Sequence, residues 1–164
     1  MESELFHTAD YAGQEKVVKI LENVFSGCSL NIEQHYDDYD LDIYMTATTK
    51  NNIVHKYVYE CKDREYPHTA FKTGKNAGWM ISPYKYNKLL EASKRGYKPI
   101  YFNTFSDNTF CAWNILDCPY TNGTVDAAVY TVKPSEVVTK HSYFFHIKDD
   151  ENGNKMYSFS GRTN

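Results

Sequence analysis

The tripeptide Glu60-Cys61-Lys62 follows a short apolar run and places a carboxylate and an ammonium group two residues apart. Side chains alternate along a β-strand, so Glu60 and Lys62 are expected on the same face. On an exposed face they would form a solvated ion pair of little energetic weight. On a buried face the charges need partners, and a lysine beside a carboxylate could orient a water or offset the charge of a phosphate.

Alternating apolar residues predict two strands around these groups, over residues 39–47 and 53–62. The segment between them is rich in threonine and asparagine, which favour turns, so the two strands are expected to form a β-hairpin. The length of its loop decides which side chains share a face. Pairing of Thr49 with Ile53 leaves a three-residue loop, whereas a two-residue turn would place Cys61 on the face in question.

The three-residue loop would bring a second carboxylate, Asp42, opposite Glu60, and would place Asp40 opposite Lys62. Directly opposed residues have Cβ atoms about 4.5–5.5 Å apart, and two carboxylates at that separation repel unless a cation lies between them. Mg²⁺ suits such a pair because it prefers oxygen ligands. The hairpin therefore predicts a carboxylate pair for a divalent cation, with a lysine beside it.

Helices are predicted on both sides of this hairpin, followed by further strands. An apolar stripe predicts a first helix over residues 10–25 with Asp10 as its N-cap, and Ser82, Pro83 and Gly96 mark the start and end of a second helix. The strands expected after it cover residues 98–106, 109–117 and 124–132, and a terminal hairpin covers 142–148 and 155–160. This order predicts an α+β (α/β) fold with a mixed central sheet flanked by helices.

Asp42 followed by Glu60-Cys61-Lys62 on one hairpin resembles the motif of the PD-(D/E)XK, or restriction endonuclease-like, nuclease superfamily. A helix before the hairpin that carries Glu15 resembles the Holliday junction resolvase-like branch. The resemblance implies a core of order α-β-β-α-β with extra C-terminal strands.

The resemblance covers residues 10 to about 116 of a single domain, with residues 117–164 as a C-terminal β extension. It departs from the family in one respect, since the proline of the Pro-Asp dipeptide is replaced by tyrosine before Asp40 and by leucine before Asp42. The aspartate ligand is therefore open between these two, and Asp42 is favoured because the predicted pairing places it opposite Glu60.

The activity that the resemblance implies is Mg²⁺- or Mn²⁺-dependent hydrolysis of DNA phosphodiester bonds by an endonuclease. The metal ligands it implies are Asp42, Glu60, the backbone carbonyl of Cys61 and, as a second choice, Asp40. Lys62 would position the attacking water, and Glu15 would hold a second metal or a water bound to one. Metal ions in such sites polarise the phosphate and lower the pKa of bound water.

A basic segment follows the motif, because residues 61–98 carry nine Lys and Arg against three Asp and Glu. The side chains expected to bind the nucleic-acid backbone are Lys72, Lys75, Lys85 and Lys88; each alone would also suit a solvated surface. The small size favours a phage or bacterial nuclease acting on branched DNA, such as a junction or a flap. RNA is not distinguished from DNA, and symmetric cutting of two strands would need a homodimer.

Bulk composition favours a folded protein but not one that coats nucleic acid. The chain has 164 residues, a net charge of −3 and a pI of about 6.1, whereas such proteins are usually basic. The alternative function is therefore a catalytically inactive module on the same fold that binds nucleic acid or protein. The four cysteines match no zinc pattern, which predicts free thiols in the cytoplasm, and neither a signal peptide nor a membrane span is expected.

Overall fold

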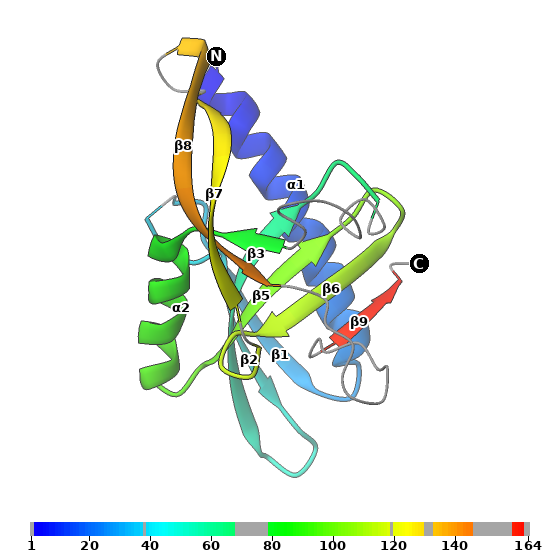
Figure 1. Ribbon diagram of the computed structural model, residues 1–164. Helices are drawn as coiled ribbons and strands as arrows, with labels where there is room; N and C mark the ends of the chain where they lie inside the picture. Colours follow the sequence, from blue (N-terminus) through cyan, green and yellow to red (C-terminus); the bar gives the residue numbers. More distant parts are fainter. Residues whose placement is uncertain are drawn as a thin grey trace.

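Two helices and nine strands make up the part of the chain that the computed structural model describes, residues 2–37, 39–67, 79–118, 120–129, 133–145 and 159–162 (Figure 1). The elements are α1 (Glu2–Val24), β1 (Ser29–Gln34), β2 (Ile43–Thr48), β3 (Val54–Asp63), β4 (Trp79–Ile81), α2 (Pro83–Lys94), β5 (Lys98–Thr104), β6 (Thr109–Asn114), β7 (Tyr120–Val129), β8 (Lys133–Phe145) and β9 (Phe159–Arg162).

The strands form two sheets. The larger has the order β1-β2-β3-β5-β6-β9, in which β3 and β5 are parallel and the other neighbours antiparallel. The smaller has the order β4-β8-β7 and is antiparallel. The predicted α+β class with a mixed central sheet is therefore confirmed.

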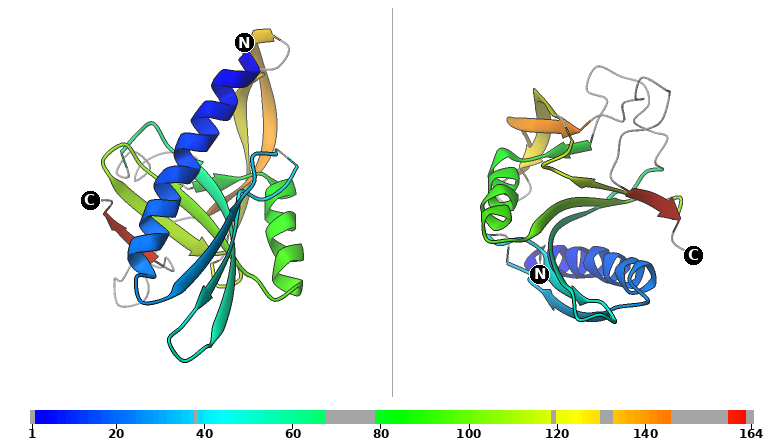
Figure 2. Two further views of the ribbon diagram at one scale, coloured as in Figure 1. Left: turned by 180° about the vertical axis from the view of Figure 1, so that it is seen from behind. Right: turned by 90° about the horizontal axis from the view of Figure 1, so that it is seen from below.

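The two helices pack on opposite faces of the large sheet (Figure 2). On one face Leu21 of α1 packs in a cluster with Tyr59, and on the other Leu89 of α2 packs in a cluster with Val58. Neighbours on β3 thus serve opposite faces, as alternation along a strand requires. No helix in the described ranges is long and apolar enough to cross a membrane.

The predicted loop of the first hairpin is confirmed. The register runs from Ile43 opposite Tyr59 to Thr48 opposite Val54, and the N–H of Thr49 donates to the carbonyl of the residue four positions on at 2.9 Å. The three loop residues end with Asn52, whose φ is 61°. Asparagine tolerates this left-handed conformation better than most residues, so the asparagine-rich loop fixes the register of the strands.

Several predicted boundaries differ from the structure: β5 and β6 end at Thr104 and Asn114, before the expected residues 106 and 117, and β7 runs from Tyr120 to Val129 where 124–132 was expected. Two of the differences lie before the motif. The strand expected to begin at residue 39 begins at Ile43. In the segment before it, Asp37 Oδ1 accepts a hydrogen bond from the N–H of Tyr39, and Asp40 Oδ1 accepts one from the N–H of Leu41. Such local bonds compete with pairing between strands. Asp10 is not an N-cap, since α1 begins at Glu2 and runs through it. No glycine or proline interrupts the eight preceding residues.

The start and end of α2 match the prediction. The Ser82 hydroxyl accepts a hydrogen bond from the Lys85 N–H, a proline opens the helix, and Gly96 follows it with a φ of 93°. The described ends of the predicted terminal hairpin pair elsewhere, since Tyr143 of β8 pairs with Asn122 of β7 and β9 pairs with β6, and its residues 146–158 lie outside the described residues. Local alternation identified these strands but could not identify partners distant in the sequence.

Candidate functional site

A pocket of about 300 Å³ lies beside the end of β3, between residues of α1 and α2. Its lining includes Gln14 from α1, Asp42, Glu60 and Lys62 from the hairpin, and Lys85 from α2. The three charged residues of the predicted hairpin motif therefore come together in one cavity. We refer to this cavity as the carboxylate pocket.

Asp42 is fixed by contacts from two elements. Its Oδ2 accepts a hydrogen bond of 2.7 Å from the N–H of Cys61, and its Oδ1 accepts one of 3.3 Å from Gln14 Nε2. Its own N–H donates to the carbonyl of Tyr59, the residue that also pairs with Ile43. Two successive residues thus face one residue of β3, as in a β-bulge, which re-aims a side chain. Asp42 therefore reaches the pocket through this bulge, and not as the direct cross-strand partner of Glu60 that the sequence predicts.

Glu60 lies on the α2 face of the sheet, and its side chain is only 14% exposed. Burial, followed by the charge of Asp42, raises its pKa to about 8, although the cations of Lys85 and Lys62 act in the opposite direction. Glu60 Oε2 is buried and accepts no hydrogen bond from any described residue. The Lys85 ammonium lies 3.3 Å from it, which is an ion pair without hydrogen-bond geometry. This carboxylate is poorly stabilised and favours a cation nearby.

Lys62 lies one strand repeat beyond Glu60 and is exposed at the pocket. Within the described ranges it forms no ion pair, since Glu60 pairs with Lys85 instead. The simple explanation of Glu60 and Lys62 as a solvated pair therefore does not hold. The carbonyl of Cys61 points to the same side of β3 as that of Tyr59, which accepts from Asp42, because alternate residues of a strand direct their carbonyls alike.

Gln14, and not Glu15, is the α1 side chain in this pocket. Gln14 is 2% exposed, and its Nε2 also donates to the carbonyl of His35 at 2.7 Å. It continues the buried stripe of Val17 and Leu21 at spacings of three and four residues, whereas Glu15 is rotated off that stripe. The helical spacing of the apolar residues was the signal that could have identified Gln14.

Asp40, the second choice as a ligand, lines a neighbouring pocket of about 440 Å³ with Lys88 and Arg95. Its Oδ1 accepts hydrogen bonds from the Tyr44 hydroxyl at 2.8 Å and from a backbone N–H, and its Oδ2 lies 2.9 Å from His35 Nδ1. Burial alone would raise the pKa of Asp40, but these partners outweigh burial and lower it. Asp40 is thus satisfied by the protein and lies apart from Glu60.

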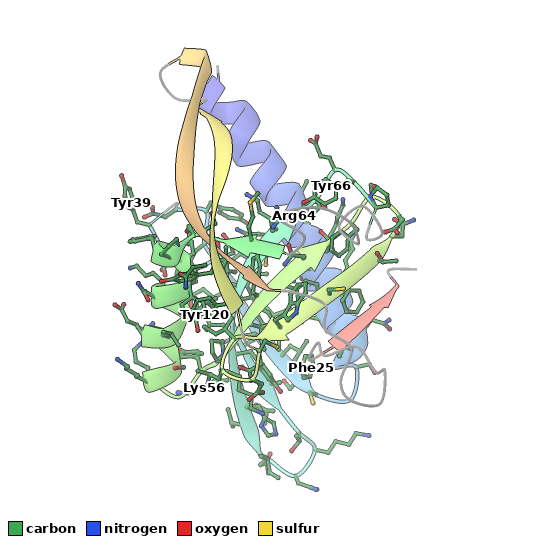
Figure 3. All side chains as sticks on the ribbon, in the orientation of Figure 1. Phe25, Tyr39, Lys56, Arg64, Tyr66 and Tyr120 are labelled. Atoms are coloured by element: carbon green, nitrogen blue, oxygen red, sulfur yellow. The ribbon has the colours of Figure 1, made fainter. Side chains whose placement is uncertain are left out.

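The candidate lysines of the basic segment divide into three groups. Lys85 enters the carboxylate pocket and Lys88 lines the neighbouring one, while Lys72 and Lys75 lie outside the described residues. Two exposed tyrosines accompany them, Tyr39 at 75% and Tyr84 at 50% exposure. The Tyr84 hydroxyl donates to the Tyr39 carbonyl at 3.1 Å. The Tyr39 side chain lies at the outer edge of the molecule (Figure 3).

A buried arginine supports the end of β3 that carries the motif. Arg64 is 6% exposed and donates to Asn103 Oδ1, to the Tyr101 hydroxyl and to the carbonyl of Met80, at 3.0, 2.7 and 3.2 Å. Figure 3 shows Arg64 and Tyr66 near this end of the large sheet. Because Met80 belongs to β4, which leads directly into α2, these bonds fix the start of α2, and with it Lys85, relative to β3.

The motif brings three oxygen ligands for a metal ion to the pocket, the side-chain carboxylates of Asp42 and Glu60 and the backbone carbonyl of Cys61. Among the described residues, no three His, Cys, Asp or Glu side chains form a group arranged to hold one. The donors nevertheless fit a hard divalent cation that keeps several waters, as Mg²⁺ does. The buried Glu60 Oε2, which accepts no hydrogen bond from a described residue, would gain a partner from it.

No protein-family model, curated protein or solved structure matches this chain. The function must therefore be inferred from the pocket and from the motif that forms it.

Proposed function

We propose that this protein is a metal-dependent deoxyribonuclease of the PD-(D/E)XK type, with the carboxylate pocket as its active site. The observation that carries the proposal is the buried Glu60 carboxyl, whose Oε2 accepts no described hydrogen bond and which lies beside Asp42 with Lys62 at the same pocket. Separately, any two of these residues would be unremarkable. Together they are the acid, acid and lysine that the motif requires.

The order of the elements around the pocket also supports the proposal. A helix precedes the hairpin β2–β3, and a second helix leads to β5, which joins β3 in parallel. This is the α-β-β-α-β order that the resemblance implies, with β1 and β4 as additional strands. The tail adds β7 and β8 to a separate sheet and β9 to the edge of the large one.

Each residue has a role that its position allows. Asp42, Glu60 and the Cys61 carbonyl would hold Mg²⁺ or Mn²⁺, which when bound polarises the scissile phosphate and lowers the pKa of a bound water. The exposed ammonium of Lys62 would orient the attacking water and offset charge on the phosphate. Gln14 would keep the Asp42 carboxylate in place through its hydrogen bond. No ligand role remains for Glu15, which lies outside the lining.

The net negative charge of the pocket favours binding of a cation, and DNA is expected to enter only after a cation has bound. Its lining includes five carboxyl groups against the two ammonium groups of Lys62 and Lys85; the five are Asp37, Asp42, Glu60, Asp63 and Glu65. DNA phosphates would be repelled from this surface without a bound cation. The exposed rings of Tyr39 and Tyr84 beside it could stack on unpaired bases, which favours a branched or single-stranded substrate.

Cleavage of a labelled panel in Mg²⁺ and in Mn²⁺ tests the proposal. The panel holds single strand, duplex, flap, four-way junction and RNA. We expect Glu60→Ala and Lys62→Ala each to lose at least about 100-fold in rate. Lys56→Ala is the matched control, because Lys56 is another exposed lysine on β3 that does not line the pocket; this variant should cleave as the wild type does.

Two results would count against the nuclease. Equal cleavage by wild type and both pocket variants would identify a contaminant as the source. No cleavage of any substrate by folded protein would leave the inactive module that binds nucleic acid or protein.

A further inference from the structure

Lys85 is the pocket residue whose position the nuclease mechanism does not explain. Its ammonium donates to the backbone carbonyl of Asp40 at 2.6 Å and lies 3.3 Å from Glu60 Oε2. The side chains of Lys85 and Glu60 are 18% and 14% exposed. A lysine that only binds the DNA backbone from the surface would be more exposed and would not lie against a buried carboxylate.

The geometry of this ion pair is incomplete. Glu60 Oε2 accepts no hydrogen bond from a described residue, and the ammonium directs its shorter contact at the Asp40 carbonyl. A buried pair is well stabilised only when its geometry is good and further hydrogen bonds satisfy both charges. Lys85 therefore offsets the charge of Glu60 without satisfying that oxygen, and a better partner could displace it.

We propose that Lys85 is a built-in counterion, which occupies the cation position beside Glu60 and is displaced when a divalent metal ion binds there. The inference rests on the proposed function, because it takes Asp42 and Glu60 as ligands. Lys85 is then a positioning residue, which stabilises the two neighbouring carboxylates of the folded protein in the absence of metal. Lys85 lines the pocket, so the released ammonium would face an anionic substrate there.

Metal titration of variants provides the first test. Melting temperature and calorimetric affinity are measured in Mg²⁺, Mn²⁺ and Ca²⁺ for the wild type, Lys85→Met and Lys88→Met. Lys88 is the matched control, three residues along α2 and lining the neighbouring pocket. We expect Lys85→Met to melt lower without metal, to show a larger metal-induced rise, and to bind metal on the order of tenfold more tightly. Lys88→Met should match the wild type.

Lysine labelling of the wild type provides the second test and needs no variant to fold. Amine acetylation followed by mass spectrometry should label Lys85 slowly without metal and several-fold faster with saturating Ca²⁺. Labelling of Lys88 should not change. Displacement thus predicts faster labelling of Lys85 and unchanged labelling of Lys88.

The outcomes separate this inference from the proposed function. If wild type and Lys85→Met bind metal equally, or if metal leaves Lys85 labelling unchanged or lower, the counterion is wrong while the metal site stands. If metal binds only after Lys85 is replaced, the wild-type ammonium blocks the site and is not displaced, so the counterion proposal and the metal-dependent function of the wild type are both wrong. If neither protein binds any of the three metals, both proposals fail.

Discussion

Two neighbouring pockets of this protein place a carboxyl group in opposite environments. In one, Asp40 accepts hydrogen bonds from Tyr44 and a backbone N–H and lies against His35, so its pKa is lowered. In the other, Glu60 has a buried oxygen that accepts no described hydrogen bond and an acidic neighbour, so its pKa is raised. The first arrangement stabilises the fold, and the second leaves binding energy for a ligand.

Neutralising one aspartate in each pocket is the most direct test of whether the two pockets differ in function. Asp42→Asn keeps the size of the side chain and an acceptor for the Cys61 N–H, but removes charge from the proposed metal ligand. We expect it to lose at least about 100-fold in cleavage rate, whereas Asp40→Asn should change the rate little. Initial rates on the best substrate of the panel measure both. Equal losses would mean that the two pockets form one catalytic site.

The carboxyl groups of the two pockets should change the free energy of unfolding in opposite directions as the pH rises. The folded pKa of Glu60, about 8 against an ordinary 4.5, means that the folded protein holds this proton more tightly than the unfolded chain. Its contribution to stability is therefore lost as the pH rises from about 4.5 to about 8, at up to about 1.4 kcal/mol per pH unit. Glu60→Gln should remove that loss, so that it equals the wild type near pH 4.5 and exceeds it by up to a few kcal/mol near pH 8.

Urea denaturation at both pH values measures this difference. Asp40→Asn should behave in the opposite sense and lower stability at neutral pH, because a lowered pKa stabilises the fold above its ordinary value of 3.8. A Glu60→Gln variant less stable than the wild type near pH 8 would mean that the ion pair with Lys85 outweighs the burial of the charge.

The sequence was sufficient for the parts of the site that depend on local geometry. Asparagines in the loop fixed the register of β2 and β3, and alternation along β3 placed Glu60 and Lys62 on one face. Serine, proline and glycine marked α2, which carries Lys85. These signals act over a few residues, where propensity and hydrogen-bonding rules are strong.

What the sequence could not supply depends on contacts between distant segments. The choice between Asp40 and Asp42 was open because both alternate on one predicted strand; in the structure Asp40 lies against His35, whereas Asp42 accepts hydrogen bonds from Gln14 and Cys61. The pairing of β9 with β6 was missed because nothing local specifies a strand partner about 50 residues away. Tertiary contacts therefore place one aspartate at each pocket.

The smallest expected effect tests whether the two pockets are independent. Tyr44→Phe removes the hydroxyl that donates to Asp40 Oδ1 but keeps the ring between His35 and Tyr97. A third of Asp40 is exposed, so solvent replaces part of the lost bond, and we expect a loss of about 1 kcal/mol at neutral pH in urea denaturation. The loss should shrink as the pH falls below 3.8, the ordinary pKa of Asp40, because the lost bond stabilises its charged form.

The metal-induced rise in melting temperature should be unchanged in Tyr44→Phe if the carboxylate pocket is independent. The hydrogen bond from the Lys85 ammonium to the Asp40 carbonyl joins the two pockets, and Asp37 lines both of them. A changed metal response in Tyr44→Phe would mean that movement of Asp40 is transmitted through this bond to the ammonium beside Glu60. The satisfied carboxylate would then control the unsatisfied one by holding the lysine that competes with the metal, and the contrast between the pockets would be a coupling.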